Sequence, residues 1–175
     1  MTRSARGAAA TQADVERMLR EAFAGPAWHG PSLRGALRGV RVAEALWQPG
    51  PGRNRIWDLA LHTAYAKLRV LRRLDAEAAG RFPRRVDRGW WPRLPEPADA
   101  AAWAADLALL DDCHRRLVEA VGRLSGPVLA ARRSGKRWTL AQEATGITLH
   151  DVYHAGQIRL MRRLFADRRT PGERR

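Results

Sequence analysis

Four stretches of the sequence repeat apolar residues at intervals of three and four, the spacing of a helix that buries one face. They cover approximately residues 12–24, 54–79, 99–124 and 139–166. No stretch alternates apolar and polar residues with an excess of β-branched side chains, so the pattern of a strand is nearly absent. Four long amphipathic helices without strands between them predict an all-α fold, in which they pack as a four-helix bundle.

Glycine and proline mark the connections between these helices. The first long helix stops before Gly25-Pro26, and the prolines and glycines of residues 48–52 form a loop that no regular element can cross. Shorter helical pieces are expected near residues 32–37 and 42–47. Residues 80–97 are rich in proline and predict a long irregular crossover between the second and third long helices.

Capping residues indicate where two of the long helices begin. Asn54 is a good N-cap type for the second helix, and Thr139 with Gln142 has the spacing of a capping box at the start of the last one. We therefore expect a single domain over residues 11–167. Residues 1–10 are expected to form a disordered basic tail, and residues 168–175 a basic C-terminal tail.

Composition excludes several classes of protein. The only cysteine is Cys113, which rules out an internal disulfide framework and a cysteine-rich zinc site. No run of 18 apolar residues is present, and the first residues lack the apolar core of a signal peptide. We expect a cytoplasmic protein that does not interact with membranes.

The formal net charge of +14 suggests nucleic acid as a possible class of partner. The charge comes almost entirely from arginines, which are scattered over both ends, the loops and the exposed helix faces. Neither zinc-finger spacing nor an alternation of basic and aromatic residues is present. A solvated basic surface is the better interpretation, and no specific nucleic-acid partner is expected.

The last helix carries the most informative pair of residues, His150 and His154. Residues four apart stack on one face of a helix, so both imidazoles can offer a nitrogen to a single ion. A helical projection places the pair on the apolar arc, which also contains Ile147, Gln157, Ile158, Met161, Leu164 and Phe165. The opposite, polar arc contains Thr148, Asp151, Arg159, Arg162 and Arg163. Two core histidines that bond to the backbone or to each other are the alternative.

A third ligand can come from His62 in the second long helix. A neighbouring helix of a bundle can bring this side chain beside the other two histidines. The projection places His62 at the polar border of its helix, near Asp58 and Arg69. This position is compatible with a site that opens to solvent, and equally with an ordinary surface histidine.

Three segments resemble the DinB/YfiT-like superfamily: residues 28–33 (Trp-His-Gly-Pro-Ser-Leu), residues 51–62 around Ile-Trp-Asp-Leu-Ala-Leu-His, and the string His150 to Ile158. Trp91-Pro92 and the spacing of Trp103, Leu110, His114 and Leu117 fit as well. The resemblance implies a four-helix bundle with a divalent metal ion, commonly zinc or nickel, held by three histidines. It assigns these ligand roles to His62, His150 and His154. Relatives often have His-Ser-Ile-Trp where this chain has Asn-Arg-Ile-Trp at residues 54–57, so an accessory histidine is missing.

Members of that superfamily include thiol-dependent transferases and isomerases and proposed hydrolases. The resemblance therefore implies a metal-dependent hydrolase or thiol S-transferase that acts on a small molecule, such as a low-molecular-weight thiol. The alternative is a non-catalytic metal-binding stress-response protein in which the ion is structural. Relatives are often dimers, and an exposed Trp90-Trp91 pair would supply apolar surface for a homodimer.

Other polar residues are weaker candidates. His29 can contact a ligand or substrate from its loop or simply pack on Trp28. Asp58 can orient His62 or act as an acid in the first helical turn, and Gln157 can bond a water or substrate or be a plain buried amide. His114 is on the core stripe of its helix, where a satisfied core histidine is the commoner outcome. Cys113 does not share a helix face with His114, so the two are not expected to act as a pair.

Overall fold

The computed structural model describes residues 4–87 and 89–168, and within this part of the chain it is helical. The helices are α1 (Ser4–Phe23), α2 (Leu33–Leu37), α3 (Val42–Leu46), α4 (Ile56–Leu74), α5 (Ala76–Ala79), α6 (Ala100–Gly122), α7 (Gly126–Ala130) and α8 (Leu140–Asp167). Among the described residues only an isolated bridge between Arg132 and Thr139 has strand pairing. The predicted all-α fold is confirmed.

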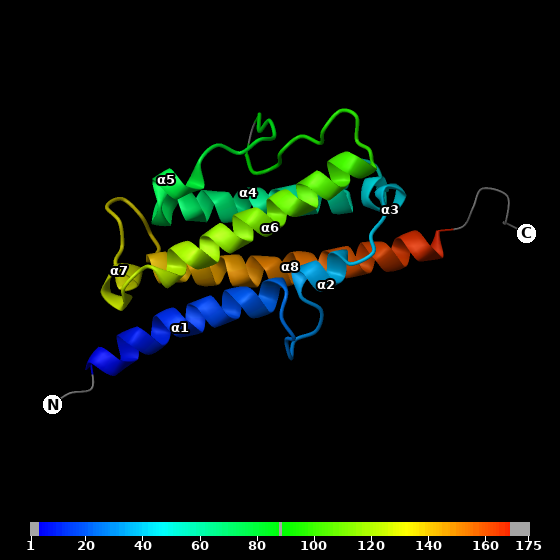
Figure 1. The fold of residues 1–175 in the computed structure, drawn as a ribbon. Coiled ribbons are helices and arrows are strands. Elements are labelled where there is room, and N and C mark those ends of the chain that lie inside the picture. The colour runs from blue at the N-terminus through cyan, green and yellow to red at the C-terminus, as the bar shows by residue number, and fades with distance from the viewer. Residues whose placement is uncertain (1–3, 88, 169–175) are drawn as a thin grey trace, which may run out of the picture.

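The four long helices α1, α4, α6 and α8 form the bundle (Figure 1). Each of α1 and α4 packs against both α6 and α8, so α1 and α4 lie on one diagonal of the bundle and α6 and α8 on the other. In Figure 1, α4 and α6 run in the same direction, from the α3 end to the α5 and α7 end. Parallel neighbours cannot be joined by a tight turn, which explains why the long connection after α5 returns along the whole bundle.

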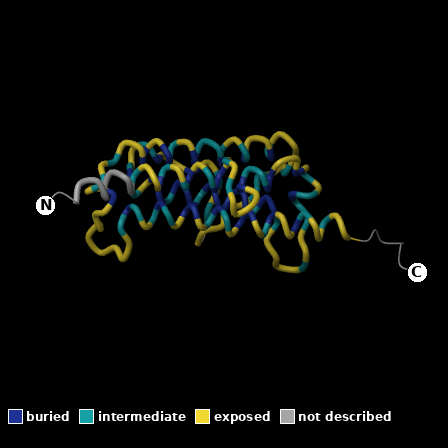
Figure 2. Tube along the Cα trace, turned by 90° about the horizontal axis from the view of Figure 1, so that it is seen from below, coloured by how far each residue is buried: buried dark blue, intermediate teal, exposed yellow. Residues whose placement is uncertain are grey.

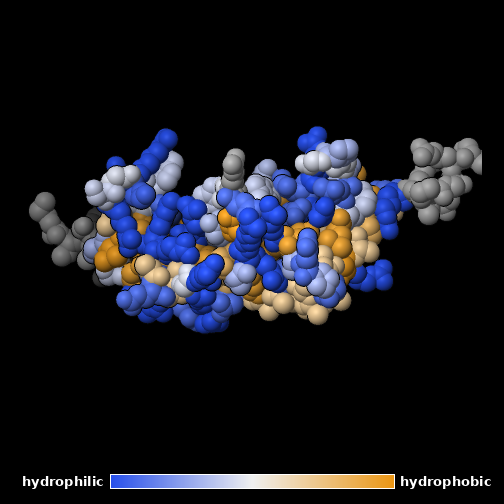
Figure 3. Space-filling view, turned by 90° about the horizontal axis from the view of Figure 1, so that it is seen from above, coloured by the Kyte–Doolittle hydropathy of each residue, from blue (hydrophilic) through white to orange (hydrophobic). Residues whose placement is uncertain are grey.

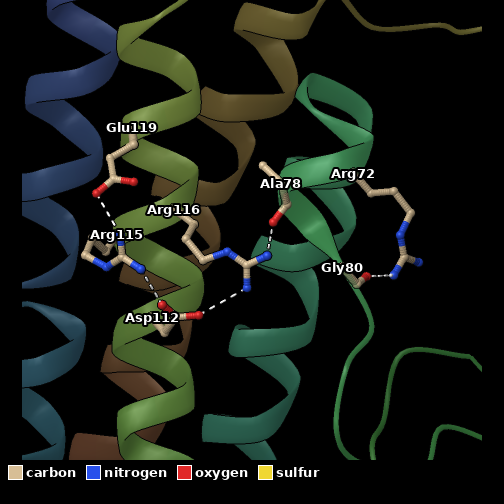
Figure 4. A network of polar contacts seen from close by, with 7 residues as sticks. All are labelled: Arg72, Ala78, Gly80, Asp112, Arg115, Arg116 and Glu119. Atoms are coloured by element: carbon tan, nitrogen blue, oxygen red, sulfur yellow. Dashed lines mark hydrogen bonds and ion pairs between the residues drawn. The ribbon is translucent and has the colours of Figure 1, made fainter.

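Arginines of α4 and α6 bind the start of this crossover through hydrogen bonds (Figure 4). Arg116 on α6 pairs with Asp112 at 3.1 Å and also donates a hydrogen bond to the carbonyl oxygen of Ala78 in α5. Arg72 on α4 donates to the carbonyl oxygen of Gly80 at 2.9 Å. These contacts satisfy carbonyl groups at the end of a short helix, which have no partner within it.

Helix boundaries differ from the prediction at several points. The first helix begins at Ser4, ahead of the predicted start at residue 12, because the alanine-rich segment favours helix. Residues 4–10 of the expected disordered tail thus lie in α1, while residues 1–3 and 169–175 lie outside the described residues. The predicted helix over 54–79 is divided at Asp75, whose side chain accepts a hydrogen bond from the Ala78 N–H at 2.9 Å and so caps α5.

The caps of the bundle helices explain where they begin. The N-cap of α4 is Arg55 rather than the predicted Asn54, and the Asp58 carboxylate accepts from the Arg55 N–H at 2.7 Å. The predicted capping box of Thr139 and Gln142 at the start of α8 is confirmed. Asp99 caps α6 in the same manner through the Ala102 N–H.

The core extends along the inside of the bundle (Figure 2), and α4 is buried on almost every side. Three expectations from the helical projections are therefore wrong. His62 lies in the core, 8% exposed, and not at a polar border; Asp151 and Thr148, expected on the polar arc of α8, are buried. Leu164, expected on the apolar arc, is exposed. The face of α8 that points into the bundle differs from the projected one, because the polar Asp151 has a buried partner on α4. A projection of one helix does not include such a partner.

The outer surface is polar over much of its area. Figure 3 shows hydrophilic residues spread along the length of one face, with apolar residues between them. Many arginines take part in surface ion pairs along a helix, as Arg17 does with Glu21 on α1 and Arg115 with Glu119 on α6. None of the helices in the described part is long and apolar enough to cross a membrane.

Candidate metal centre

His62 on α4 and His150 and His154 on α8 converge at the interface between these two helices. The Nε2 atom of His150 lies 3.0 Å from Nε2 of His62 and 3.1 Å from Nε2 of His154. The three ligand atoms all lie within 4.8 Å of one another. The structure therefore brings together the three residues that the sequence singled out, in a group that can hold a metal ion.

Hydrogen bonds orient two of the three rings. Nδ1 of His62 lies 2.8 Å from the carbonyl oxygen of Trp90, and Nδ1 of His154 lies 2.7 Å from Oε1 of Gln157. Because both partners are acceptors, each Nδ1 must carry the proton of its neutral ring. The Nε2 atoms of His62 and His154 are then unprotonated, with lone pairs directed at the centre of the group.

The donor set at this centre fits a cation. The neutral His150 ring can carry at most one proton on Nε2. It can donate that proton to Nε2 of His62 or to Nε2 of His154, so the lone pair of the other ring faces a nitrogen without a proton between them. Its Nδ1 atom is buried without a partner among the described residues. Imidazole nitrogens bound to one ion at about 2.1 Å lie roughly 3.0–3.4 Å apart, which agrees with the separations of 3.0 and 3.1 Å between Nε2 of His150 and those of His62 and His154.

The surroundings keep all three imidazoles neutral. Burial lowers the pKa of His62, although its hydrogen bond to the Trp90 carbonyl acts in the opposite direction. Burial is also the main cause that lowers the pKa of His150 to about 3 and that of His154 to about 4. Since a metal ion requires the neutral ring, these shifts favour the form that can bind.

The crossover between α5 and α6 covers this centre. Besides the Trp90 carbonyl, the Trp91 indole stacks on the His62 ring with 4.1 Å between ring centroids and 17° between planes. The Trp90 ring packs under the guanidinium of Arg69 at 4.6 Å. Both tryptophans are about two-fifths exposed, and the Trp91 ring covers one face of the His62 ring.

A buried aspartate holds the crossover in place. Asp106 on α6 accepts hydrogen bonds from the indole of Trp57 and from Arg84, both at 2.8 Å. Trp57 lies on α4 and Arg84 on the crossover, so one carboxylate joins three segments. This arrangement sets the path of the chain that presents Trp90 and Trp91 to His62.

Gln157 lies behind His154 and connects it to Tyr153. Its Nε2 atom donates to the Tyr153 hydroxyl at 3.1 Å, while its Oε1 accepts from His154. Gln157, a candidate for contact with a water or substrate, thus orients the His154 ring in this structure. Tyr153 is 62% exposed and stands at the solvent side of the site.

Sequence reasoning missed a buried ion pair beside the histidines. Lys67 on α4 and Asp151 on α8 are fully buried, and Nζ lies 2.6 Å from Oδ1 while also contacting Oδ2. Burial lowers the pKa of Lys67 and raises that of Asp151, and the attraction between the two charges opposes both shifts. The available signal was a lysine inside an otherwise apolar run of α4, which requires a partner of opposite charge.

The remaining weaker candidates form no hydrogen bond with the three histidines among the described residues. Asp58 caps α4, as described above. His29 is exposed and lines a separate hollow on the surface of α8. His114 is buried in α6 and stacks on Phe23 with 3.7 Å between centroids. Cys113 is buried as well, and burial raises the pKa of its thiol to about 11.

Comparison with known proteins identifies the family of this chain. A family model described as the DinB superfamily matches residues 27–158, a segment that includes α4, α6 and all three histidines. No curated protein and no solved structure matches the sequence. Since the family model covers most of the chain, the protein belongs to the DinB superfamily.

Proposed function

We propose that this protein is a divalent-metal-dependent enzyme, a hydrolase or thiol S-transferase, in which His62, His150 and His154 hold the ion. The observation that carries the proposal is the convergence of three Nε2 atoms with two of the lone pairs fixed by hydrogen bonds. Within the described residues no fourth histidine, cysteine or carboxylate joins the group. Three protein ligands with an open position are typical of catalytic sites, whereas structural zinc sites have four.

An ion bound to three neutral imidazoles keeps its full charge and supplies a Lewis acid that lowers the pKa of a water or a thiol. The protein contributes the orientation of the ligands. The Trp90 carbonyl and Gln157 fix two ring tautomers, and Trp91 restricts rotation of His62 and excludes water from one side. Tyr153 and His150 lie on the side that faces solvent, where a small substrate can approach.

Zinc and nickel are both compatible with imidazole ligands, and we propose one of them as the resident ion. A structural ion in a non-catalytic protein is the second candidate. The observation in its favour is that the ligands come from two different helices, so that an ion would join α4 to α8.

The first test is metal binding by the untagged protein after removal of metal with a chelator. We expect about one Zn²⁺ or Ni²⁺ per chain, and a loss of affinity of at least about 100-fold for His62→Ala and for His154→Ala. His29→Ala is the matched control, because it removes a histidine outside the group, and its affinity should equal that of the wild type. Unchanged affinity in His62→Ala would remove this residue from the site.

The second test separates the catalytic from the structural role. The metal-loaded protein is assayed for hydrolysis of activated esters and for conjugation of low-molecular-weight thiols to an electrophile, and its unfolding is measured with and without chelator. Turnover that disappears on chelation while the fold persists supports the enzyme. Unfolding on chelation, with no turnover in either assay, supports the structural ion.

A further inference from the structure

The helix α8 has a second apolar face, which points away from the bundle. Its inner face is used by residues such as Ile147, Ile158 and Met161, which are buried in the core. The outer face carries four large apolar side chains that are 43–63% exposed: Leu149, Tyr153, Leu160 and Leu164. Their spacings of four, seven and four residues place them on one stripe of the helix.

The outer face is shaped to accept another helix. Gly146 and Gly156 lie in the same stripe, and a Cβ atom added at either position would meet nothing within 4 Å. The sequence of positions 146, 149, 153, 156 and 160 alternates steps of three and four, which is the spacing of a helix seam. The stripe from Leu149 to Leu164 is roughly 22 Å long, enough for about four turns of a partner helix.

Two hollows adjoin this stripe, one beside Leu149 and the other beside Leu160. One, of about 490 Å³, lies between α1 and the first half of α8 and is lined by residues including Val15, Trp138 and Leu149. The other, of about 400 Å³, lies between the loop before α2 and the second half of α8, where Val152 and Leu160 form its apolar part. In Figure 1 that loop lies beside the middle of α8. Separate hollows beside an apolar stripe fit side chains inserted from a partner helix, whereas a flat membrane surface would not fill them.

The charged residues beside the stripe indicate which kind of partner helix would bind there. Arg159 and Arg163 line the second hollow, and within the described part of the chain neither forms an ion pair. Arg162, in contrast, pairs with Glu44 at 2.9 Å and belongs to the fold. Apart from Glu143, which pairs with Arg73, and the buried Asp151, no carboxylate occurs on α8 before Asp167. The outer face is therefore apolar with a basic edge.

We propose that the outer face of α8, defined by Leu149, Tyr153, Leu160, Leu164, Arg159 and Arg163, is a docking surface for an acidic amphipathic helix of a partner protein. Leucine-type side chains of the partner fill the two hollows, and its carboxylates pair with the two guanidinium groups. None of the three histidines takes part in the stripe; its residue nearest to the metal centre is Tyr153, which accepts a hydrogen bond from Gln157 beside His154.

The test uses the full chain and two labelled synthetic peptides of three heptads. Both have leucine at the seam positions, and the flanking positions are glutamate in one peptide and lysine in the other. Fluorescence anisotropy should show binding of the glutamate peptide with a Kd of about micromolar order, and at least about tenfold weaker binding of the lysine peptide.

Variants locate the surface. The double substitution Leu160→Gln/Leu164→Gln should weaken binding of the glutamate peptide at least about tenfold. Arg159→Glu/Arg163→Glu should reverse the preference between the two peptides. Val128→Gln and Arg81→Glu, which change exposed residues elsewhere, are the matched controls and should leave both affinities unchanged. Circular dichroism and metal content verify that every variant is folded.

Three results would overturn the proposal. The first is that neither peptide binds, or that binding is unaffected by the α8 variants. The second is a dimer in light scattering that becomes a monomer in Leu160→Gln/Leu164→Gln, because the surface would then be covered by a second copy. The third is binding to anionic phosphatidylglycerol vesicles that requires Leu160 while the peptides do not bind, which would make the face a membrane contact.

Discussion

Breaking the buried pair of Lys67 and Asp151 should strongly destabilise the protein. Each side chain is 0% exposed, so removal of one partner leaves a charge in the core without compensation. For Asp151→Asn or Lys67→Met we expect a loss of about 3–5 kcal/mol in the free energy of unfolding. In a domain of this size such a loss corresponds to roughly 6–20 °C in the melting temperature.

The double variant Lys67→Met/Asp151→Val should be much more stable than the sum of its single substitutions predicts. An apolar pair of similar volume requires no compensation of charge, so its cost should be below that of either single variant. Urea unfolding is followed by circular dichroism with chelator present, which prevents metal binding from contributing to the stability.

A surface pair provides the control for this cycle. Arg115 and Glu119 on α6 lie 2.8 Å apart and are 59% and 48% exposed, so their coupling should be below about 1 kcal/mol. Single substitutions at Lys67 or Asp151 that cost less than about 1 kcal/mol, or effects that add in the double variant, would refute the reasoning.

Two further predictions concern buried groups of α6. Burial, together with the positive charge of Lys67, lowers the pKa of His114 to about 2, so the folded state binds its proton more weakly than the unfolded state, where the pKa is 6.5. The stability that neutral His114 contributes is therefore complete above pH 6.5 and decreases as the pH falls. Between about pH 6.5 and 4.5, urea unfolding should show the stability advantage of the wild type over His114→Gln decrease by roughly 2–3 kcal/mol. An advantage that does not change with pH would contradict this prediction. Cys113, whose thiol pKa is raised by burial to about 11, should react slowly with Ellman's reagent near about pH 8 in the native protein and rapidly in concentrated urea, and equal rates would contradict its burial.

Local sequence patterns were sufficient to predict the four long helices and the short helices α2 and α3, but not α5 and α7. Apolar periodicity, glycine and proline breaks and the capping box at Thr139 depend on residues within a few positions of one another, so they can be read without tertiary structure. The same holds for His150 and His154, whose separation of four residues places them on one face of any helix. The break at Asp75 was not predicted, because helical periodicity continues across it and only its side-chain cap ends the pattern.

Tertiary structure decided which faces are buried and what surrounds the site. His62 reaches the other histidines because α4 packs against α8, and Asp151 is buried because Lys67, 84 residues earlier in the sequence, lies opposite to it. Trp90 and Trp91 appear in sequence as spare apolar surface, yet one supplies a carbonyl and the other a stacked ring to His62.

Tertiary structure also decided that the outer stripe of α8 is exposed. Both sides of this helix carry apolar residues, and a projection of one helix cannot tell which side faces its neighbours. The sequence by itself determines which segments become helices and which residue types can bind a metal, since both depend on local geometry and side-chain chemistry. Only contacts between distant segments determine which of those residues meet, which are buried and which face remains available to a partner.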